Sequence, residues 1–139
     1  MGKINWGRVF LGGLLMGVVW GVLEAIKFPL VGSDFLAAVL PVGQASISMS
    51  AGLIAFWIPM ELVLGTWTMW LYAAMRPRYG PGPKTAAVAG FALWVIGSWV
   101  DVIWAWLAVI PPAVLVAPVA ADLPIDIVAA VAGAWLYRE

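Results

Sequence analysis

The residues best suited to chemistry in this sequence are four acidic side chains, one in each long apolar stretch: Glu24, Glu61, Asp101 and Asp126. Each lies about 18 to 25 Å along a helix from a basic residue near the end of its stretch. Because the hydrocarbon core of a bilayer is about 30 Å thick, this spacing places the four carboxyl groups at a similar depth. A carboxyl group there is costly in lipid, so we expect it to turn into the protein.

Converging carboxyl groups cannot all ionise without a cation or a basic partner. Oxygen ligands suit protons and hard cations, so the four acids predict a proton- or cation-binding site, with the identity of any metal left open. A structural interpretation stands beside this one. Glu24 is one helical turn from Lys27 and can pair with it, and Asp126 can lie near the start of a short helix.

The absence of cysteine and histidine removes the usual ligands of iron–sulfur, zinc and haem sites, and the usual nucleophile–base pairs. We therefore expect no catalytic residues, no cofactor and no enzymatic activity. Seven Lys and Arg balance seven Asp and Glu, so there is no positive surplus to bind nucleic acid.

The 139 residues are 65% hydrophobic and 10% charged, which is too apolar for a soluble domain. The pattern predicts a single all-α integral membrane domain, a four-transmembrane-helix bundle. We expect spans over about 6–29, 47–75 and 85–110, and a fourth that ends at Tyr137.

Three connections are less regular. The fourth span is either a kinked helix from Pro112 or a short apolar piece followed by a helix that Asp122 caps. Residues 34–41 predict a short helix in the outer interface. Residues 76–84, RPRYGPGPK, predict a cytoplasmic loop.

With four spans, the basic residues gather on one side of the membrane and only Lys27 lies near the other. This distribution predicts that both termini lie in the cytoplasm. We expect a multi-pass protein of the bacterial cytoplasmic (inner) membrane. The residues on that side are Lys3, Arg8, Arg76, Arg78, Lys84 and Arg138.

Two segments of the chain are similar to each other. Residues 58–72 align without gaps on 123–137, with Glu61 on Asp126 and a shared Trp-Leu-Tyr ending, and Gly13 and Glu24 fall on Gly90 and Asp101. This similarity predicts a duplicated two-helix unit, about 6–75 and 85–137, with parallel pseudo-two-fold symmetry.

Small residues recur at helical spacing on the faces that carry the acids, and Glu24 shares a face with Gly17. They predict close helix packing, within one chain or between copies. The packing residues are Gly13, Gly17, Gly21, Gly65, Gly97 and Gly133.

The segments MWLYAAMRPRYGPGPKTAAVAG and GAWLYRE resemble those of uncharacterised small four-span bacterial membrane proteins. The resemblance covers about a third of the chain. It implies the four-span topology and no known activity.

These patterns favour a membrane protein that binds or moves a proton, cation or small solute through the carboxylate cluster. The alternative is a non-catalytic accessory or scaffolding subunit of a larger membrane complex. Either interpretation implies the lipid bilayer as a partner, and a homo-oligomer or a membrane complex.

Overall fold

The computed structural model describes residues 4–39 and 51–138. In this part of the chain every regular element is a helix and no residue is in a strand. The five helices are α1 (Trp6–Val31), α2 (Ser33–Val39), α3 (Ala51–Tyr79), α4 (Pro83–Trp106) and α5 (Pro112–Trp135).

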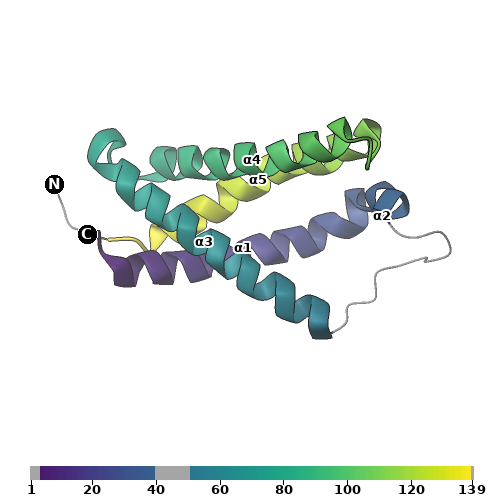
Figure 1. Ribbon diagram of the computed structural model, residues 1–139. Coiled ribbons are helices and arrows are strands. Elements are labelled where there is room, and N and C mark those ends of the chain that lie inside the picture. Colours follow the sequence, from purple (N-terminus) through teal and green to yellow (C-terminus); the bar gives the residue numbers. More distant parts are fainter. Residues whose placement is uncertain (1–3, 40–50, 139) are drawn as a thin grey trace.

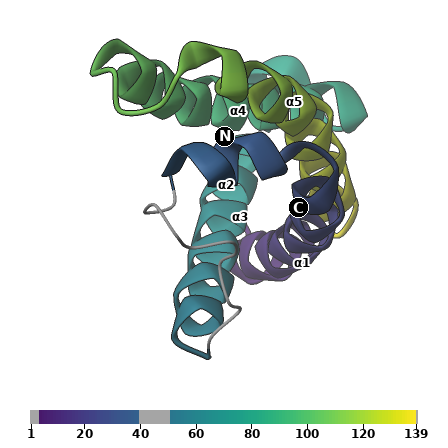
Figure 2. The same ribbon diagram turned by 90° about the vertical axis from the view of Figure 1, so that its right-hand side faces the viewer.

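Helix α1 is the centre of the arrangement because it packs against both α3 and α5, while α4 packs on α5. Both ends of the chain lie at one end of the molecule with the α3–α4 turn, which we call the basic end (Figure 1). The α4–α5 turn and α2 lie at the opposite end, called the far end. The N-terminal part of α3 leans away from α4 and α5 (Figure 2).

Three helices, α1, α4 and α5, are long and apolar enough to cross a membrane. Helix α3 is not among them, so the predicted four-transmembrane-helix bundle is wrong. The sequence of α3 explains the difference, since it carries Glu61, Thr66 and Thr68 in its middle and Arg76 and Arg78 in its last turn. Polar side chains therefore interrupt α3 more often than the other long helices.

The predicted duplication of a two-helix unit is wrong as well. A two-fold axis would make the α1–α5 contact equivalent to the α3–α4 contact, yet α1 lies along α5 whereas α3 meets α4 sparsely. Close approach of α1 and α5 depends on glycine, because a Cβ on Gly133 would lie 2.6 Å from the carbonyl oxygen of Gly12. Among the described residues no glycine joins α3 to α4 in this way.

The turn between α3 and α4 is shorter than the predicted loop over 76–84. Helix α3 continues through Pro77 to Tyr79, and the turn is 80–82. Gly80 ends the helix with a φ of +82°, and its N–H donates to the carbonyl oxygen of Arg76 at 2.9 Å. This is the left-handed helix end that glycine adopts readily.

Helix α5 runs without interruption from Pro112, which confirms the first of the two interpretations of the fourth apolar segment. Asp122 is therefore a mid-helix residue and not a cap. The short helix predicted over 34–41 is confirmed as α2, although Pro41 lies outside the described residues. The predicted start of the second span, Ile47, and the basic residue Lys3 also lie outside them.

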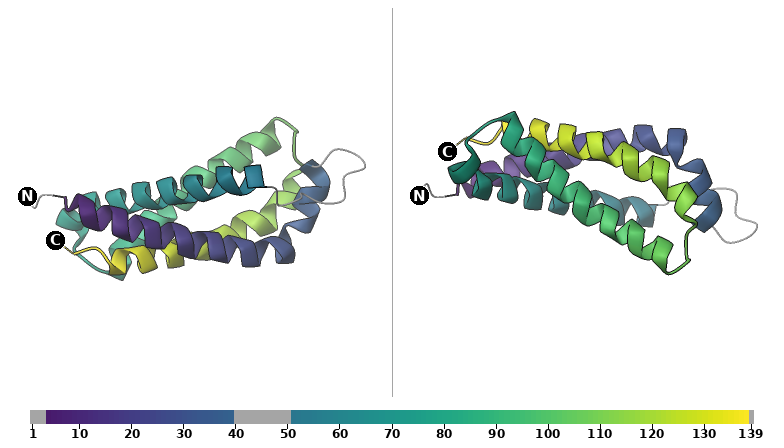
Figure 3. Two further views of the ribbon diagram at one scale, coloured as in Figure 1. Left: turned by 90° about the horizontal axis from the view of Figure 1, so that it is seen from below. Right: turned by 90° about the horizontal axis from the view of Figure 1, so that it is seen from above.

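The core gathers towards the basic end. Its largest fully buried side chains are Val9, Met16, Thr68 and Met69. Two tyrosines close this end: the rings of Tyr72 and Tyr137 meet edge to face at 5.8 Å, and the Arg76 guanidinium lies over both. Views from below and above show the N-terminal part of α1 and the C-terminal part of α5 at this end (Figure 3).

Glycine also sets the contact between α1 and α3. A Cβ on Gly13 would lie 2.4 Å from Cα of Thr66, and one on Gly17 would lie 2.9 Å from the carbonyl oxygen of Glu61. The two backbones touch here, which only residues without a side chain permit. Gly97 on α4, by contrast, has no other atom within 4 Å of its Cβ position.

We expect Gly65→Ala to destabilise the protein, because the new Cβ would lie 2.4 Å from the carbonyl oxygen of Gly13 and would force α1 and α3 apart. Overpacking of this kind costs about 1–3 kcal/mol. The measurement is the free energy of unfolding in mixed detergent micelles, followed by circular dichroism.

Gly97→Ala is the matched control, since it makes the same helix-favouring change where there is room. Its free energy of unfolding should equal or exceed that of the wild type. Equal stability of the two variants would contradict the glycine-dependent contact.

Candidate functional site

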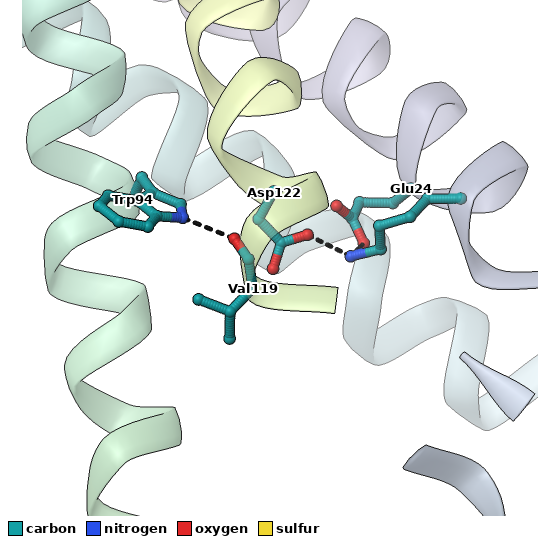
Figure 4. A network of polar contacts seen from close by, with 5 residues as sticks. Glu24, Trp94, Val119 and Asp122 are labelled. Atoms are coloured by element: carbon teal, nitrogen blue, oxygen red, sulfur yellow. Dashed lines mark hydrogen bonds and ion pairs between the residues drawn. The ribbon is translucent and has the colours of Figure 1, made fainter. Parts of the chain in front are cut away.

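An ionic network joins α1 to α5 (Figure 4). Its residues lie in the half of each helix nearer the far end. The ammonium group of Lys27 lies 2.6 Å from the Glu24 carboxylate on its own helix and also binds the Asp122 carboxylate on α5. The Lys27 side chain is 13% exposed, and those of Glu24 and Asp122 are 28% and 29% exposed. The network is therefore partly shielded from the surroundings and partly open to them.

Asp126 lies one turn beyond Asp122 on α5 and is only 4% exposed. The charges of Asp122, Glu24 and Lys27 all act on it, as does the Trp20 indole of α1. Its Oδ1 atom nevertheless has no hydrogen bond, and neither has Oε1 of Glu24. We call Glu24, Lys27, Asp122 and Asp126 the Lys27 cluster.

The side of α5 away from α1 is fixed by a tryptophan. The indole N–H of Trp94 on α4 donates to the carbonyl oxygen of Val119 at 2.8 Å (Figure 4). Val119 is one turn before Asp122, so α4 anchors α5 directly beside the cluster. A partly buried indole N–H satisfied in this way holds the two helices in one register.

The structure separates the four predicted site residues. Glu24 and Asp126 belong to the Lys27 cluster. Asp101 on α4 is close enough to interact electrostatically with Asp122 and Lys27. Glu61 stands apart. Its carboxylate lies against Gly21 of α1, where a Cβ would be 2.2 Å from Oε2, and within the described residues it makes no hydrogen bond or ion pair.

The described acidic residues are not grouped as a metal centre requires. Among the described residues, no group of three acidic side chains could hold a metal ion. The position between Glu24 and Asp122 that a cation would take is occupied by the ammonium group of Lys27. The cluster instead consists of three carboxyl groups of unequal exposure around the single positive charge of Lys27.

Sequence reasoning gave Lys27 and Asp122 only structural roles, yet they form the centre of the cluster. Two signals were present: Lys27 follows Glu24 by three residues, and Asp122 precedes Asp126 by four, which places each pair on one helical face. Among the glycines, Gly12 and Gly90 were missed. A Cβ on Gly90 would lie 2.6 Å from the carbonyl oxygen of Asp126, so this glycine brings α4 against α5 beside the site.

No protein-family model matches the chain, and neither a curated protein nor a solved structure is significantly similar to it. The geometry of the Lys27 cluster is therefore the basis for a functional proposal.

We expect Lys27→Met to destabilise the protein by about 2 kcal/mol, a value between those of exposed and fully buried ion pairs. Stability is lost because the partly buried carboxylates of Glu24 and Asp122 then have no positive partner at the contact between α1 and α5. The measurement is again the free energy of unfolding in detergent micelles.

Lys84→Met makes the same change at an exposed position of α4 and should leave that free energy nearly unchanged. Neutralising both partners as well, in Lys27→Met/Glu24→Gln/Asp122→Asn, should restore part of the stability. A Lys27→Met protein as stable as Lys84→Met would show that the network contributes nothing to the fold.

Proposed function

We propose that this chain is a membrane protein that binds a proton reversibly at the Lys27 cluster and moves it as part of its function. The observation that carries the proposal is the buried Asp126 carboxyl group, whose Oδ1 has no hydrogen bond. An ionised carboxylate in an apolar interior is very costly unless it is paired and hydrogen-bonded. A proton removes that cost at Asp126.

The balance of charge supports the same proposal. Lys27 is the one positive side chain in the cluster, and it already binds both Glu24 and Asp122. Asp126 adds a third carboxyl group and Asp101 a fourth close by. One ammonium group cannot neutralise four carboxylates, so at least one of these carboxyl groups is available to bind a proton.

The gradient of exposure favours access from the far end. Asp122 is 29% exposed, whereas Asp126, one turn nearer the basic end, is 4% exposed. Beyond Asp126 towards the basic end lie Met16, Met69 and Thr68, which are fully buried and do not ionise. We therefore propose that a proton reaches the cluster from the far end and that its passage to the basic end requires this packing to open.

The distribution of basic residues supports an orientation. Arg8 in the first turn of α1, Arg78 in the last turn of α3, Lys84 in the first turn of α4 and Arg138 after α5 all lie at the basic end by their positions in the chain. The described acidic residues lie further along the helices or on α2. Basic residues next to membrane-crossing helices favour the cytoplasmic side. We therefore propose that the basic end faces the cytoplasm and that the Asp122 side of the Lys27 cluster faces the opposite side of the membrane. Helix α3 is less apolar than the three candidate spans, but it packs along α1 and returns the chain to the basic end (Figure 1).

Replacing Asp126 by asparagine should abolish proton binding and movement. In pH-difference infrared spectra of the reconstituted protein, we expect the wild type to show a protonated-carboxyl band that Asp126→Asn lacks. In liposomes that contain a pH-sensitive dye, proton flux through Asp126→Asn should fall to the level of protein-free liposomes.

Asp34→Asn is the control, because Asp34 is an exposed carboxylate on α2 and outside the cluster. It should keep both the infrared band and the flux. An infrared band without flux in the wild type would limit the function to proton binding. Absence of both would overturn the proposal and favour an accessory subunit.

The orientation is testable with single cysteines, because the chain has none of its own. In intact bacterial cells, a membrane-impermeant maleimide should label Asp34→Cys at the far end. Arg78→Cys at the basic end should be labelled only after permeabilisation. The reverse pattern would contradict the proposed orientation.

A further inference from the structure

Two exposed arginines come together at the basic end of the molecule, and we call them the arginine pair. Arg8 lies in the first turn of α1, and Arg138 follows the end of α5. The side chain of Asn5 joins them, because its Oδ1 accepts from the backbone N–H of Arg8 and its Nδ2 donates to the carbonyl oxygen of Arg138, both at 3.2 Å. A single amide group therefore brings residues from the two ends of the sequence to one place.

Two buried tyrosines connect the arginine pair to the rest of the basic end. The Tyr137 hydroxyl accepts from the backbone N–H of Asn5 at 3.3 Å, and the Tyr137 ring packs edge to face on Tyr72 of α3. The Tyr72 hydroxyl accepts from the backbone N–H of Gly82, just before α4, at 3.2 Å. These contacts link the arginine pair to all four long helices, so the folded helices determine its position.

The positive charge of the arginine pair is not balanced within the described part of the chain. The ion pairs there are those of Lys27, and neither Arg8 nor Arg138 forms one. Because the hydrogen bonds of both arginines to Asn5 use backbone atoms, these bonds leave the two guanidinium groups available. A guanidinium group binds phosphate oxygens through two parallel charge-assisted hydrogen bonds. The arginine pair is therefore suited to a ligand that carries a phosphate group.

Two exposed tryptophans indicate the source of that phosphate group. Trp6 is the first residue of α1 and Trp135 the last of α5, so each lies within one turn of an arginine of the pair. Tryptophan is enriched where membrane-crossing helices pass the lipid headgroups, and α1 and α5 are both candidate spans. Phe10 is exposed as well, and its ring centroid lies 6.4 Å from that of Trp6. The arginine pair therefore borders an exposed apolar surface at the level of the headgroups.

We propose that the arginine pair binds the headgroup of an anionic phospholipid, whose acyl chains lie along the exposed apolar surface next to Trp6 and Phe10. A free phosphate ion would use the two guanidinium groups but not this surface. The bound lipid would join the start of α1 to the end of α5 at the edge of the bilayer. The inference goes beyond the proposed function, because it requires a membrane protein but no movement of protons.

Native mass spectrometry of the whole protein, released from detergent micelles with added lipid, tests the site. We expect the wild type to retain phosphatidylglycerol about tenfold better than phosphatidylcholine with the same acyl chains, an effect that one charge-assisted hydrogen bond can supply. The preference should disappear in Arg8→Gln/Arg138→Gln. Circular dichroism should show this variant folded, since the hydrogen bonds to Asn5 use backbone atoms.

Arg78→Gln/Lys84→Gln is the matched control, because it removes the same charge from exposed positions on either side of the α3–α4 turn. This variant should keep most of the preference for phosphatidylglycerol. An equal loss in the two double variants would attribute the preference to total charge and overturn the site, as would a wild type without any preference. Displacement of the lipid by inorganic phosphate would assign the arginine pair to a free anion and overturn the lipid site as well.

Asp126→Asn separates this inference from the proposed function. The variant should retain phosphatidylglycerol as the wild type does, because Asp126 lies towards the other end of α5 from Arg138. Loss of proton flux in Asp126→Asn and loss of lipid in Arg8→Gln/Arg138→Gln are therefore independent results. A protein that retains the lipid but shows neither the infrared band nor flux would keep the lipid site and lose the proton function.

Discussion

The contact of α1 with α3 on one side and α5 on the other depends on the glycines that α1 presents to each. Gly13 and Gly17 touch the backbone of α3, and Gly12 meets Gly133 of α5. In a bilayer there is no hydrophobic force between helices, so close backbone packing of small residues supplies the attraction. Helix α3 and the α4–α5 pair are therefore both held to α1, and they need only sparse contact with each other.

The register of the Lys27 cluster follows from that packing. Helices α1 and α5 are antiparallel, so residues of increasing number on α1 lie opposite residues of decreasing number on α5. Once Gly12 meets Gly133, Trp20 reaches the level of Asp126, and Lys27 reaches Asp122. The helix backbones thus determine which polar groups share the interior, and Trp94 holds α5 in place from its other side.

The long helices and the clustering of basic residues at one end could be predicted from the sequence, because both depend on the residue types within each segment. The side chains that contact each acidic residue could not be predicted in this way. The role of Asp122 depended on where α5 begins, and the prolines in this segment were compatible with two different helix starts. Glu61 and Asp126 align by residue type, but one lies against Gly21 and the other is buried opposite Trp20. Alignment matches residue types and does not fix the neighbours that a helix meets.

The unequal number of acidic and basic groups links the charge of the Lys27 cluster to the contact between α1 and α5. Lys27 attracts Asp122 across that contact, while Glu24 and Asp126 repel each other across it whenever both are ionised. A proton on either carboxyl group removes the repulsion and leaves the attraction. At the basic end the helices pack closely through the glycine contact and the buried methionines. A change in charge therefore acts on the part of the α1–α5 contact nearer the far end, where Glu24 and Asp122 are partly exposed while Asp126 is buried.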